Sequence, residues 1–314
     1  MAYPTVIFYH TVVPREADSY FARKHPTVEQ FAEHLAYLKT RFSFVSADEF
    51  LALYDGRGSR HPRRPCLLTF DDGQQHLLTH ALAVLEAQGV PCVIFVVAGA
   101  LVAEATPWYI CADYLVDAAA GKQVEYEARA FDCTGDDGLA ALKAAFKSRY
   151  IGLGADERPA AIEALAEAVG THVPALGDLP ETMRFLTPEQ VQRLAEHELV
   201  TVGSHALSHS NLATLAEAEQ EHELARSREI LAGLAPMQPA LVSYPDGSHD
   251  TTTRALARRH YDFGFAVEEG ASRRDRFAYP RICLGRMSVR GLAYWLSFRR
   301  RHIVAPLKRL LGLG

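Results

Sequence analysis

Short apolar runs recur along the chain, and longer segments with apolar residues at every third or fourth position separate them. Runs rich in Val, Ile, Leu and Phe are typical of buried strands, and the longer repeat is typical of helices that bury one face. Strands that alternate with helices favour a parallel sheet, because parallel neighbours need long crossover connections. The sequence therefore predicts an α/β fold with strands near residues 5–10, 42–45, 66–70, 92–97, 199–203, 240–244, 263–267 and 279–284.

Several of the intervening segments carry helix signals. One helix is expected over residues 28–40, and a second is expected to end at Gly89, since glycine favours helix termination. A third is expected to begin at Thr187, whose side chain can cap the helix, with proline in its first turn. A long helix with charges on its outer face is predicted over about 215–234.

The alternation stops between about residues 101 and 186. This region is rich in Ala and charged residues and is interpreted as a helical insertion folded over the C-terminal ends of the strands. Trp108 and Tyr109 open its first helix, and they are either platforms on which a ligand ring stacks or core anchors of the insertion. Two further helices are predicted near 137–150 and 157–169.

Two polar segments carry the candidate chemistry. Asp71 and Asp72 follow the apolar run at 66–70, and His205 and His209 follow the run at 199–203. Histidines four positions apart are expected on one face of a helical turn, where both rings reach one ion. Two imidazoles and one carboxylate suit a divalent metal, and the second carboxylate can take a proton from the attacking water.

The same histidine spacing occurs at His76 and His80, within a segment whose apolar residues form a helical stripe. These two are interpreted as residues on a helix surface. By contrast, the Asp-Asp-Gly, Gly-Ser-His and Ser-Tyr-Pro-Asp-Gly segments each lie at the C-terminal end of a predicted strand. Barrel enzymes assemble their sites at that end of the strands.

The motifs resemble those of the polysaccharide deacetylase family, the NodB-homology group of carbohydrate esterases. The resemblance rests on Thr-Phe-Asp-Asp-Gly at 69–73, Ser-His-Ala-Leu-Ser-His at 204–209 and Ser-Tyr-Pro-Asp-Gly at 243–247, with further likeness in the strands at 6–12 and 264–282. It covers roughly residues 4–100 and 185–285. The family implies a distorted (β/α)7-type barrel of mainly parallel strands and hydrolysis of an acetyl group from a sugar, usually an N-acetylated one.

The resemblance also implies roles for residues. Asp71 would be the catalytic base, and Asp72, His205 and His209 would hold one divalent metal, with zinc first and cobalt or nickel able to fill the same site. The third motif would line one wall of the site, so Tyr244, Pro245, Asp246 and, from the insertion, Trp108 are candidate substrate-binding residues. The backbone N–H of Tyr244 is a candidate donor to the oxyanion.

Two departures from the family pattern change the assignment of roles. The arginine that braces the base would stand in the third motif, where this chain has Ser243, so Arg281 is the candidate instead. The late Leu-x-x-His, which supplies the general acid, has no match. His302 lies in a basic tail, and His10, at the end of the first predicted strand, is the substitute candidate.

The chain has 314 residues, 48% of them hydrophobic, and a net charge of −5, which fits one globular domain over 1–314. No acidic residue follows Asp275, so the segment from about 287 to 314 is basic and amphipathic. It is either a final helix packed on the barrel or an element that contacts a membrane surface. Nucleic acid is not an expected partner, because no recognition motif accompanies the charge.

The five cysteines are odd in number and lack CxxC spacing, and Cys66, Cys92 and Cys283 stand in apolar runs. They are interpreted as buried thiols in a reducing compartment. With no signal sequence or membrane span recognised, the expected location is the cytoplasm, with the inner face of the plasma membrane as one place of action.

These observations predict a metal-dependent hydrolase that removes an N-acetyl group from an amino sugar in surface-polysaccharide or lipid-linked glycan biosynthesis. Removal of an O-acetyl or a formyl group stays open. One alternative is a non-catalytic member that binds glycan. Another is an iron oxygenase with two histidines and one carboxylate, although such enzymes commonly carry a His-x-Asp that this chain lacks. A zincin-type protease is disfavoured because Ala206 stands where the motif requires glutamate.

Overall fold

A computed structural model describes residues 3–102, 106–154, 156–236, 238, 240–267 and 271–298. Most of the candidate basic tail, including His302, lies outside these residues. In the described part of the chain, no helix combines the length and the apolar character needed to cross a bilayer.

Seven parallel strands form a closed barrel. β1 pairs with β10 on one side and with β3 on the other, and this double pairing closes the sheet in the order β1-β10-β9-β8-β7-β4-β3. The predicted (β/α)7-type barrel is confirmed. Its strands are β1 (Thr5–Tyr9), β3 (Arg64–Phe70), β4 (Cys92–Val96), β7 (Val200–Ser204), β8 (Leu241–Ser243), β9 (Phe263–Val267) and β10 (Tyr279–Cys283).

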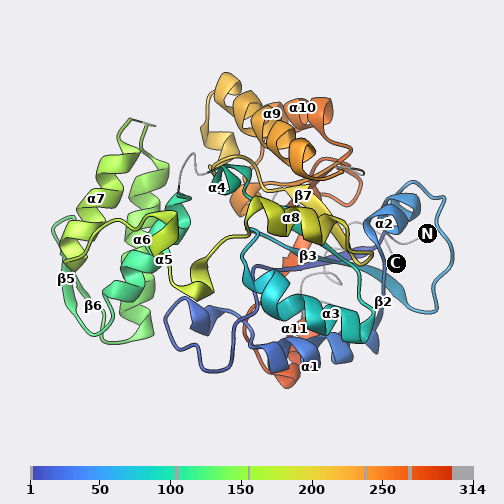
Figure 1. The fold of residues 1–314 in the computed structure, drawn as a ribbon, viewed down its shortest axis with the longest axis horizontal. Coiled ribbons are helices and arrows are strands. Elements are labelled where there is room, and N and C mark those ends of the chain that lie inside the picture. The colour runs from blue at the N-terminus through green and yellow to red at the C-terminus, as the bar shows by residue number, and fades with distance from the viewer. Residues whose placement is uncertain are drawn as a thin grey trace.

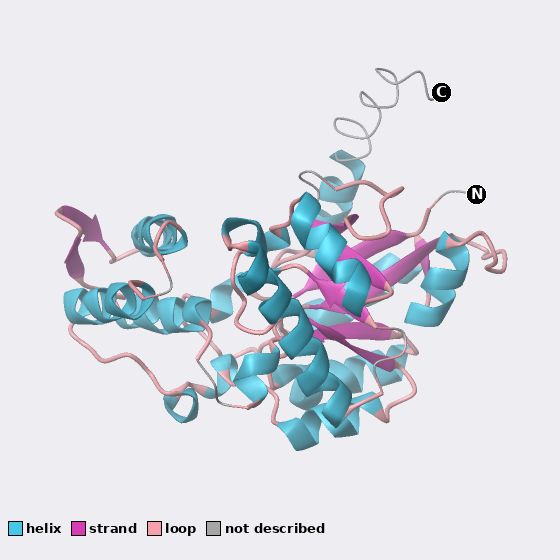
Figure 2. Cartoon of the chain, turned by 90° about the horizontal axis from the view of Figure 1, so that it is seen from above, coloured by secondary structure: helices cyan, strands magenta, loops and turns pink. Residues whose placement is uncertain are grey.

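An eighth parallel strand, β2 (Phe42–Phe44), pairs with the first half of β3 outside the barrel. Helices surround the strands (Figures 1 and 2). Two of the sequence signals act as expected: the Thr187 side chain accepts the N–H of Gln190 at the start of α8, and Gly89 ends α3 with a left-handed φ of 62°. The helices are α1 (Val28–Lys39), α2 (Ala47–Tyr54), α3 (Leu82–Gln88), α4 (Ala98–Leu101), α8 (Pro188–Ala195), α9 (Glu217–Leu234), α10 (Thr251–His260) and α11 (Val289–Phe298).

The barrel interior is apolar at one end and polar at the other. Alternate residues of a strand point inward, so β3 contributes Leu67, then Thr69 and Asp71, and β10 contributes Tyr279, then Arg281. The residues nearer the strand N-termini form one apolar cluster, which Ala47 and Phe50 of α2 join. The polar residues lie nearer the strand C-termini. A pocket opens at that end of the barrel, so apolar side chains are not needed to fill it.

The insertion forms a separate lobe beside the barrel (Figures 1 and 2). It contains α5 (Trp108–Ala118), α6 (Asp136–Ile151) and α7 (Arg158–Val169), which pack around their own hydrophobic cluster. It also contains an antiparallel hairpin of β5 (Gln123–Tyr126) and β6 (Arg129–Asp132), which the sequence did not predict. The turn of this hairpin is Glu127-Ala128, and both residues have a positive φ although neither is the glycine or asparagine that usually marks such a turn.

Candidate active site

Asp71 forms a buried ion pair with Arg281. The two guanidinium NH groups donate to the two carboxylate oxygens at 2.7 Å each, and Arg281 has an exposed fraction of only 2%. The same guanidinium donates to Ser243 Oγ at 2.6 Å and to Thr69 Oγ1 at 3.2 Å, and it lies 4.3 Å from the centre of the Phe8 ring. In the family pattern the arginine that braces the base would stand at position 243, next to Tyr244. In this structure the arginine comes from β10 instead, and Ser243 accepts a hydrogen bond from it.

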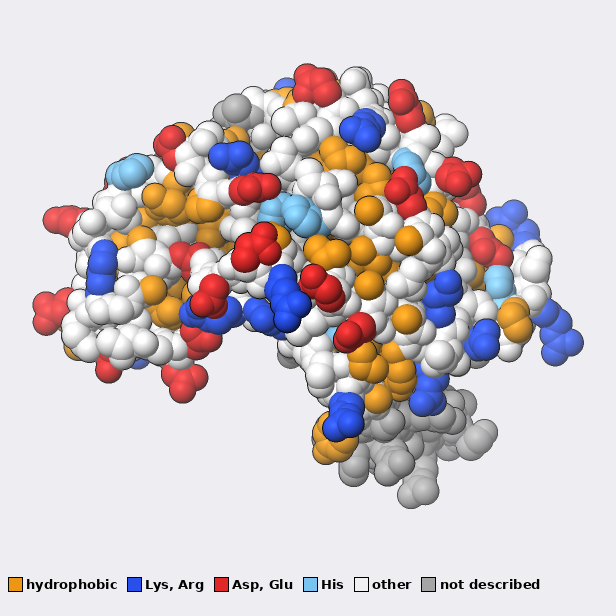
Figure 3. All heavy atoms as spheres, turned by 60° about the horizontal axis from the view of Figure 1, so that its bottom comes forward, with side chains coloured by type: hydrophobic (Ala, Val, Ile, Leu, Met, Phe, Trp, Pro, Cys, Tyr) orange, Lys and Arg blue, Asp and Glu red, His pale blue; other side chains and the backbone are white. Residues whose placement is uncertain are grey.

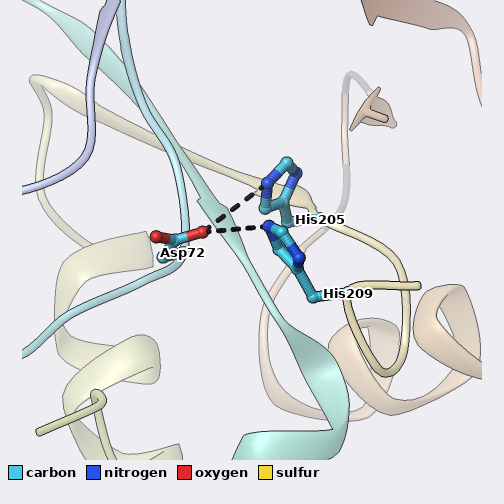
Figure 4. A group of neighbouring side chains, drawn as sticks. All are labelled: Asp72, His205 and His209. Atoms are coloured by element: carbon cyan, nitrogen blue, oxygen red, sulfur yellow. Dashed lines mark ion pairs between the residues drawn. The ribbon is translucent and has the colours of Figure 1, made fainter. Parts of the chain in front are cut away.

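Asp72, the next residue, points toward two histidines (Figure 4). Its Oδ1 lies 3.6 Å from Nε2 of His205 and 3.5 Å from Nε2 of His209. The side chains diverge because the chain turns sharply after β3, with left-handed φ values of 73° at Asp72 and 75° at Gly73. The two carboxylates therefore point in different directions, as the sequence suggested, although Nε2 of His205 also lies 3.9 Å from Oδ2 of Asp71.

The three side chains fit a divalent metal ion. Their ligand atoms lie within 4.8 Å of one another, and all three residues are buried. Bonds of about 2.1 Å in a tetrahedral arrangement would set ligand atoms about 3.4 Å apart, close to the separations of 3.6 and 3.5 Å between Asp72 and the two histidines. Asp72 Oδ1 is buried and has no hydrogen-bond partner among the described residues, which is costly for a carboxylate unless a cation completes the site. Nδ1 of His205 is held by the carbonyl oxygen of Ser243 at 2.8 Å, which directs its Nε2 toward Asp72.

The pKa shifts in the site agree with this chemistry. Burial would raise the pKa of Asp71, but the Arg281 guanidinium outweighs it and holds that pKa below its ordinary value. Burial and repulsion from Asp71 raise the pKa of Asp72, effects that a bound cation would reverse. Burial lowers the pKa of His205 and of His209, which favours the neutral imidazoles that bind metals.

The histidines do not lie on a helical turn, and that expectation is wrong. Residues 205–209 form a loop after β7 in which Ala206 and His209 have left-handed φ values of 60° and 61°. Each such conformation costs a non-glycine residue about 1–2 kcal/mol, so other contacts must hold the loop. On one side, the carbonyl oxygens of Ala206 and Leu207 accept the backbone N–H groups of Ala98 and Gly99 at 3.1 and 2.8 Å.

On the other side, Glu223 of α9 binds the loop. Its Oε2 accepts the backbone N–H groups of Leu207 at 3.0 Å and Ser208 at 2.9 Å, and its Oε1 accepts the Ser208 hydroxyl. The Glu223 side chain is nearly buried, so these bonds are shielded from water. The sequence analysis missed this residue, because a glutamate inside a charged helix carries no signal of its contact with a loop fifteen positions away.

A pocket of about 430 Å³ opens above the site. Asp71, Asp72, His205, His209 and Arg281 all line it, together with further residues that include His10, Trp108, Tyr109, Tyr244 and Asp246. Pro245 is buried and is not among the lining residues that the structure describes. His10 follows β1 at the same rim of the barrel, and burial lowers the pKa of its imidazole.

Tyr244 cannot supply an oxyanion donor from its backbone, which corrects that expectation. Its N–H already donates to the carbonyl oxygen of Phe265 at 3.0 Å, in continuation of the pairing between β8 and β9. Its hydroxyl donates to the carbonyl oxygen of Phe277 at 2.9 Å. Tyr244 therefore contributes the shape of one wall rather than a free hydrogen-bond donor.

Trp108 connects the insertion to the loop of His205 and His209. Its ring stacks on Tyr150 with ring centres 4.7 Å apart, and its Nε1 donates to the carbonyl oxygen of His209 at 3.1 Å. This agrees with the core-anchor interpretation, although Trp108 also lines the pocket. The Tyr109 ring lies 4.1 Å from the His209 ring, centre to centre.

Two smaller expectations are also corrected. His76 is buried rather than on a helix surface, and its ring packs 4.4 Å from that of His80. Cys283 is exposed at the pocket wall, because it stands at the C-terminal end of β10 where the barrel opens, whereas Cys66 and Cys92 are buried as expected.

A family model described as polysaccharide deacetylase matches residues 58–261. A curated relative, YxkH of Bacillus subtilis (strain 168), provisionally named a polysaccharide deacetylase, is 32% identical over 95 residues. That match spans 30% of this chain and 34% of the relative, so the chain aligns with about a third of the relative's length.

Solved structures share the fold over nearly the whole chain. The deacetylase PplD of Streptococcus pyogenes, solved with acetate, has a TM-score of 0.59 at 15% identity and covers 93% of this chain and 96% of its own. A de-N-acetylase from Aggregatibacter actinomycetemcomitans has a TM-score of 0.58 at 16% identity, with 93% and 98% covered. IcaB from Ammonifex degensii has a TM-score of 0.55 at 19% identity, with 93% and 95% covered.

Replacing Glu223 with alanine should weaken binding of a divalent ion. Loss of its carboxylate leaves the N–H groups of Leu207 and Ser208 without their acceptor and lets the strained loop relax. We expect metal affinity to fall by about 10- to 100-fold, as for other residues that orient metal ligands. Isothermal titration of the metal-free protein with Zn²⁺ measures it. Glu223→Gln keeps an acceptor oxygen and should bind within a few-fold of the native protein, and unchanged affinity in Glu223→Ala would contradict the role.

Replacing Arg281 with methionine should move the acid limb of the pH–rate profile upward. Without the guanidinium, burial raises the pKa of Asp71, so this carboxylate loses its charge at a higher pH. The expected displacement is roughly 1–3 pH units. The profile of kcat/KM against pH measures it. Arg281→Lys keeps a positive charge and should displace the limb less, while Arg276→Met, at a surface pair with Asp55, should leave it in place. An acid limb that stays fixed in Arg281→Met would contradict the pairing.

Proposed function

The chain belongs to the polysaccharide deacetylase family, and on this premise we propose that it is a metal-dependent hydrolase that removes an N-acetyl group from an amino sugar. One observation supports the proposal most: two adjacent carboxylates have opposite environments. Asp71 is kept ionised by Arg281, whereas Asp72 faces two imidazoles and has an unpaired oxygen. Carboxylates whose pKa values are driven apart are suited to separate roles in one reaction.

In this mechanism each group acts from a fixed position. A divalent ion held by Asp72, His205 and His209 would lower the pKa of a water molecule and polarise the acetamide carbonyl group. Asp71 accepts a proton as that water attacks the carbonyl carbon. Arg281 and the carbonyl oxygen of Ser243 orient Asp71 and His205, so the two groups need no rearrangement during the reaction.

Departure of the sugar nitrogen requires a proton. We assign its delivery to His10, which lines the pocket at the end of β1. Burial keeps the imidazole uncharged in the free enzyme, so the proton that it delivers must first come from the reacting water by way of Asp71. The products are acetate and a free amine.

Zinc is the proposed metal on the basis of ligand type, and cobalt or nickel would suit the same three ligands. For the biological setting we propose the biosynthesis of a surface polysaccharide or a lipid-linked glycan, with the enzyme in the cytoplasm or at the inner face of the plasma membrane. The five cysteines are free, which supports a reducing compartment. Recovery of the protein only from the culture medium or cell envelope after fractionation would contradict this location.

Acetate release tests the reaction. The protein stripped with chelator should release no acetate from N-acetylhexosamine oligomers, and added Zn²⁺ or Co²⁺ should restore release. Acetate is measured by a coupled enzymatic assay, and magnesium serves as a control because it prefers oxygen ligands. Full activity in the metal-free protein would rule out the mechanism, while tight metal binding without release would favour a non-catalytic glycan-binding protein. Oxygen consumption with iron would favour the oxygenase alternative.

Asp71→Asn and Asp72→Ala should fail in different ways. Asp71→Asn removes the base but no metal ligand, so metal content should remain near native while kcat falls by about 100-fold or more. Asp72→Ala removes a ligand, so metal content and activity should fall together. Metal analysis after gel filtration, combined with acetate release, separates the two. Native turnover in Asp71→Asn would contradict its assignment as base.

His10→Gln tests the proton donor. We expect kcat to fall by about 100-fold or more for N-acetyl substrates, because a poor leaving nitrogen needs the proton. An acetyl ester such as 4-nitrophenyl acetate has a leaving group that departs without protonation, so its hydrolysis should decline far less. Equal losses on the amide and the ester would assign His10 a structural role instead.

A further inference from the structure

Two lysines from distant segments meet in the wall of the catalytic pocket. Lys24 lies in the short helix Ala22–Lys24 that follows β1, and Lys143 lies in α6 of the insertion. Both ammonium groups contact the same atom, Oδ1 of Asp113 in α5, at 3.2 and 2.5 Å. Because they share one oxygen atom, the two ammonium groups lie close together. Asp113 itself is buried, with an exposed fraction of 4%.

This cluster of Lys24, Lys143 and Asp113 has more positive than negative charge. Elsewhere in the pocket, Arg281 pairs with Asp71, Lys147 pairs with Asp246 at 2.8 Å, and Asp72 faces the histidines. In the cluster, the single carboxylate of Asp113 pairs with both ammonium groups. Burial, with repulsion from Lys143, lowers the pKa of Lys24 to about 8 despite attraction to Asp113 and Asp117. The attraction of the carboxylates therefore offsets only part of the cost of burying this ammonium group.

The geometry favours an anion with several oxygen atoms. Each ammonium group has three N–H donors, of which Asp113 takes one, and Lys24 also faces the Tyr20 ring at 3.5 Å. Donors therefore remain on two neighbouring cations in a pocket wall, an arrangement that suits a carboxylate or a phosphate. The molecule is hollowed between insertion and barrel, and side chains of both charges gather along this hollow (Figure 3).

We propose that Lys24 and Lys143 bind an anionic group of the glycan substrate, either the carboxylate of an acidic sugar or a phosphate. The proposal rests on the deacetylase function proposed above and narrows its substrate class. Asp113 positions the two ammonium groups, and the acetamido group of a neighbouring sugar would lie at Asp71 and His205. The insertion then provides half of the recognition site through Lys143, while the barrel side provides the other half through Lys24.

Matched glycans test the proposal. Acetate release by the zinc-loaded enzyme is compared for three probes: a neutral N-acetylglucosamine tetramer, a tetrasaccharide that alternates N-acetylglucosamine with glucuronic acid, and an N-acetylglucosamine dimer with a 1-phosphate. We expect kcat/KM for at least one anionic probe to exceed that for the neutral one by about tenfold or more, since hydrogen bonds between charged groups are the strong ones. The preferred anionic probe identifies carboxylate or phosphate.

The ratio of anionic to neutral kcat/KM, rather than activity alone, is the decisive quantity. It should fall toward one in Lys143→Met and in Lys24→Met and should be retained in Lys143→Arg, which keeps the charge. Arg149→Met removes a positive charge from the same helix α6 outside the pocket and should keep the ratio. Thermal unfolding of each variant identifies a loss of folding, and Lys143→Arg distinguishes a lost charge from a disturbed helix.

Equal kcat/KM for all three probes in the native enzyme would overturn the proposal, and so would an undiminished ratio in both methionine variants. If no probe releases acetate, the proposed function fails, but the lysine site is still tested. Calorimetric titration of the same probes into the native protein and Lys143→Met should then show tighter binding of an anionic probe only in the native protein. Equal binding of charged and neutral probes would reject the site.

Discussion

The ion pair between Asp71 and Arg281 is the constraint on which the site depends. An ion pair inside a barrel loses the hydration of both charges, a penalty that mutual attraction offsets only with excellent geometry and further hydrogen bonds. The pair has both: two parallel N–H···O bonds, with Ser243 and Thr69 accepting from the same guanidinium and Phe8 beneath it. These contacts join β3, β8, β10 and β1, so the charge state of Asp71 is secured by the closure of the barrel itself.

A second constraint is local strain at the rim. Asp72, Ala206 and His209 have left-handed conformations that favour glycine. These turns accompany the convergence of the Asp72 carboxylate and the His205 and His209 imidazoles. The loop of His205 and His209 is held between α4 and Glu223 of α9. Gly99 of α4 leaves no space for a larger residue there, since an added Cβ would lie 2.7 Å from the carbonyl oxygen of Leu207. The packing of helices outside the barrel therefore determines where the side chains of His205 and His209 lie.

Sequence patterns predicted what depends on local periodicity. All eight strands of the main sheet were expected near their observed positions, because buried parallel strands are continuous apolar runs. The partners Asp71 with Arg281 and Asp72 with the histidines were expected from motif order together with family resemblance. The β5–β6 hairpin was missed because Glu127-Ala128 has no turn residue. The loop form of His205–His209 was missed because its support comes from α4 and α9, outside the segment itself.

Contacts between distant segments could not be predicted from local sequence patterns, because both partners must first be brought together by the fold. Nothing local to Glu223, Lys24 or Asp113 distinguishes it from other charged residues on helices. Tyr244 shows the reverse case, where a residue in a recognisable motif suggested a free N–H that the β8–β9 pairing had already used. Residue type and spacing identify groups capable of chemistry, while the hydrogen-bond partner of each group depends on the assembled fold.

The placement of the insertion has a consequence for how enzymes of this shape can diversify. It leaves the barrel after β4 and returns at β7, and these two strands are direct neighbours, paired from Cys92 with Val200 to Val96 with Ser204. The chain can therefore lengthen, shorten or exchange this lobe without altering any strand pairing. The exchange is restricted where the lobe contacts the rest of the chain. Lys147 pairs with Asp246, Asp113 pairs with Lys24, and Trp108 donates to the carbonyl oxygen of His209. A lobe grafted from another protein would have to bring equivalent contacts, or the new specificity would come with a loosened His209.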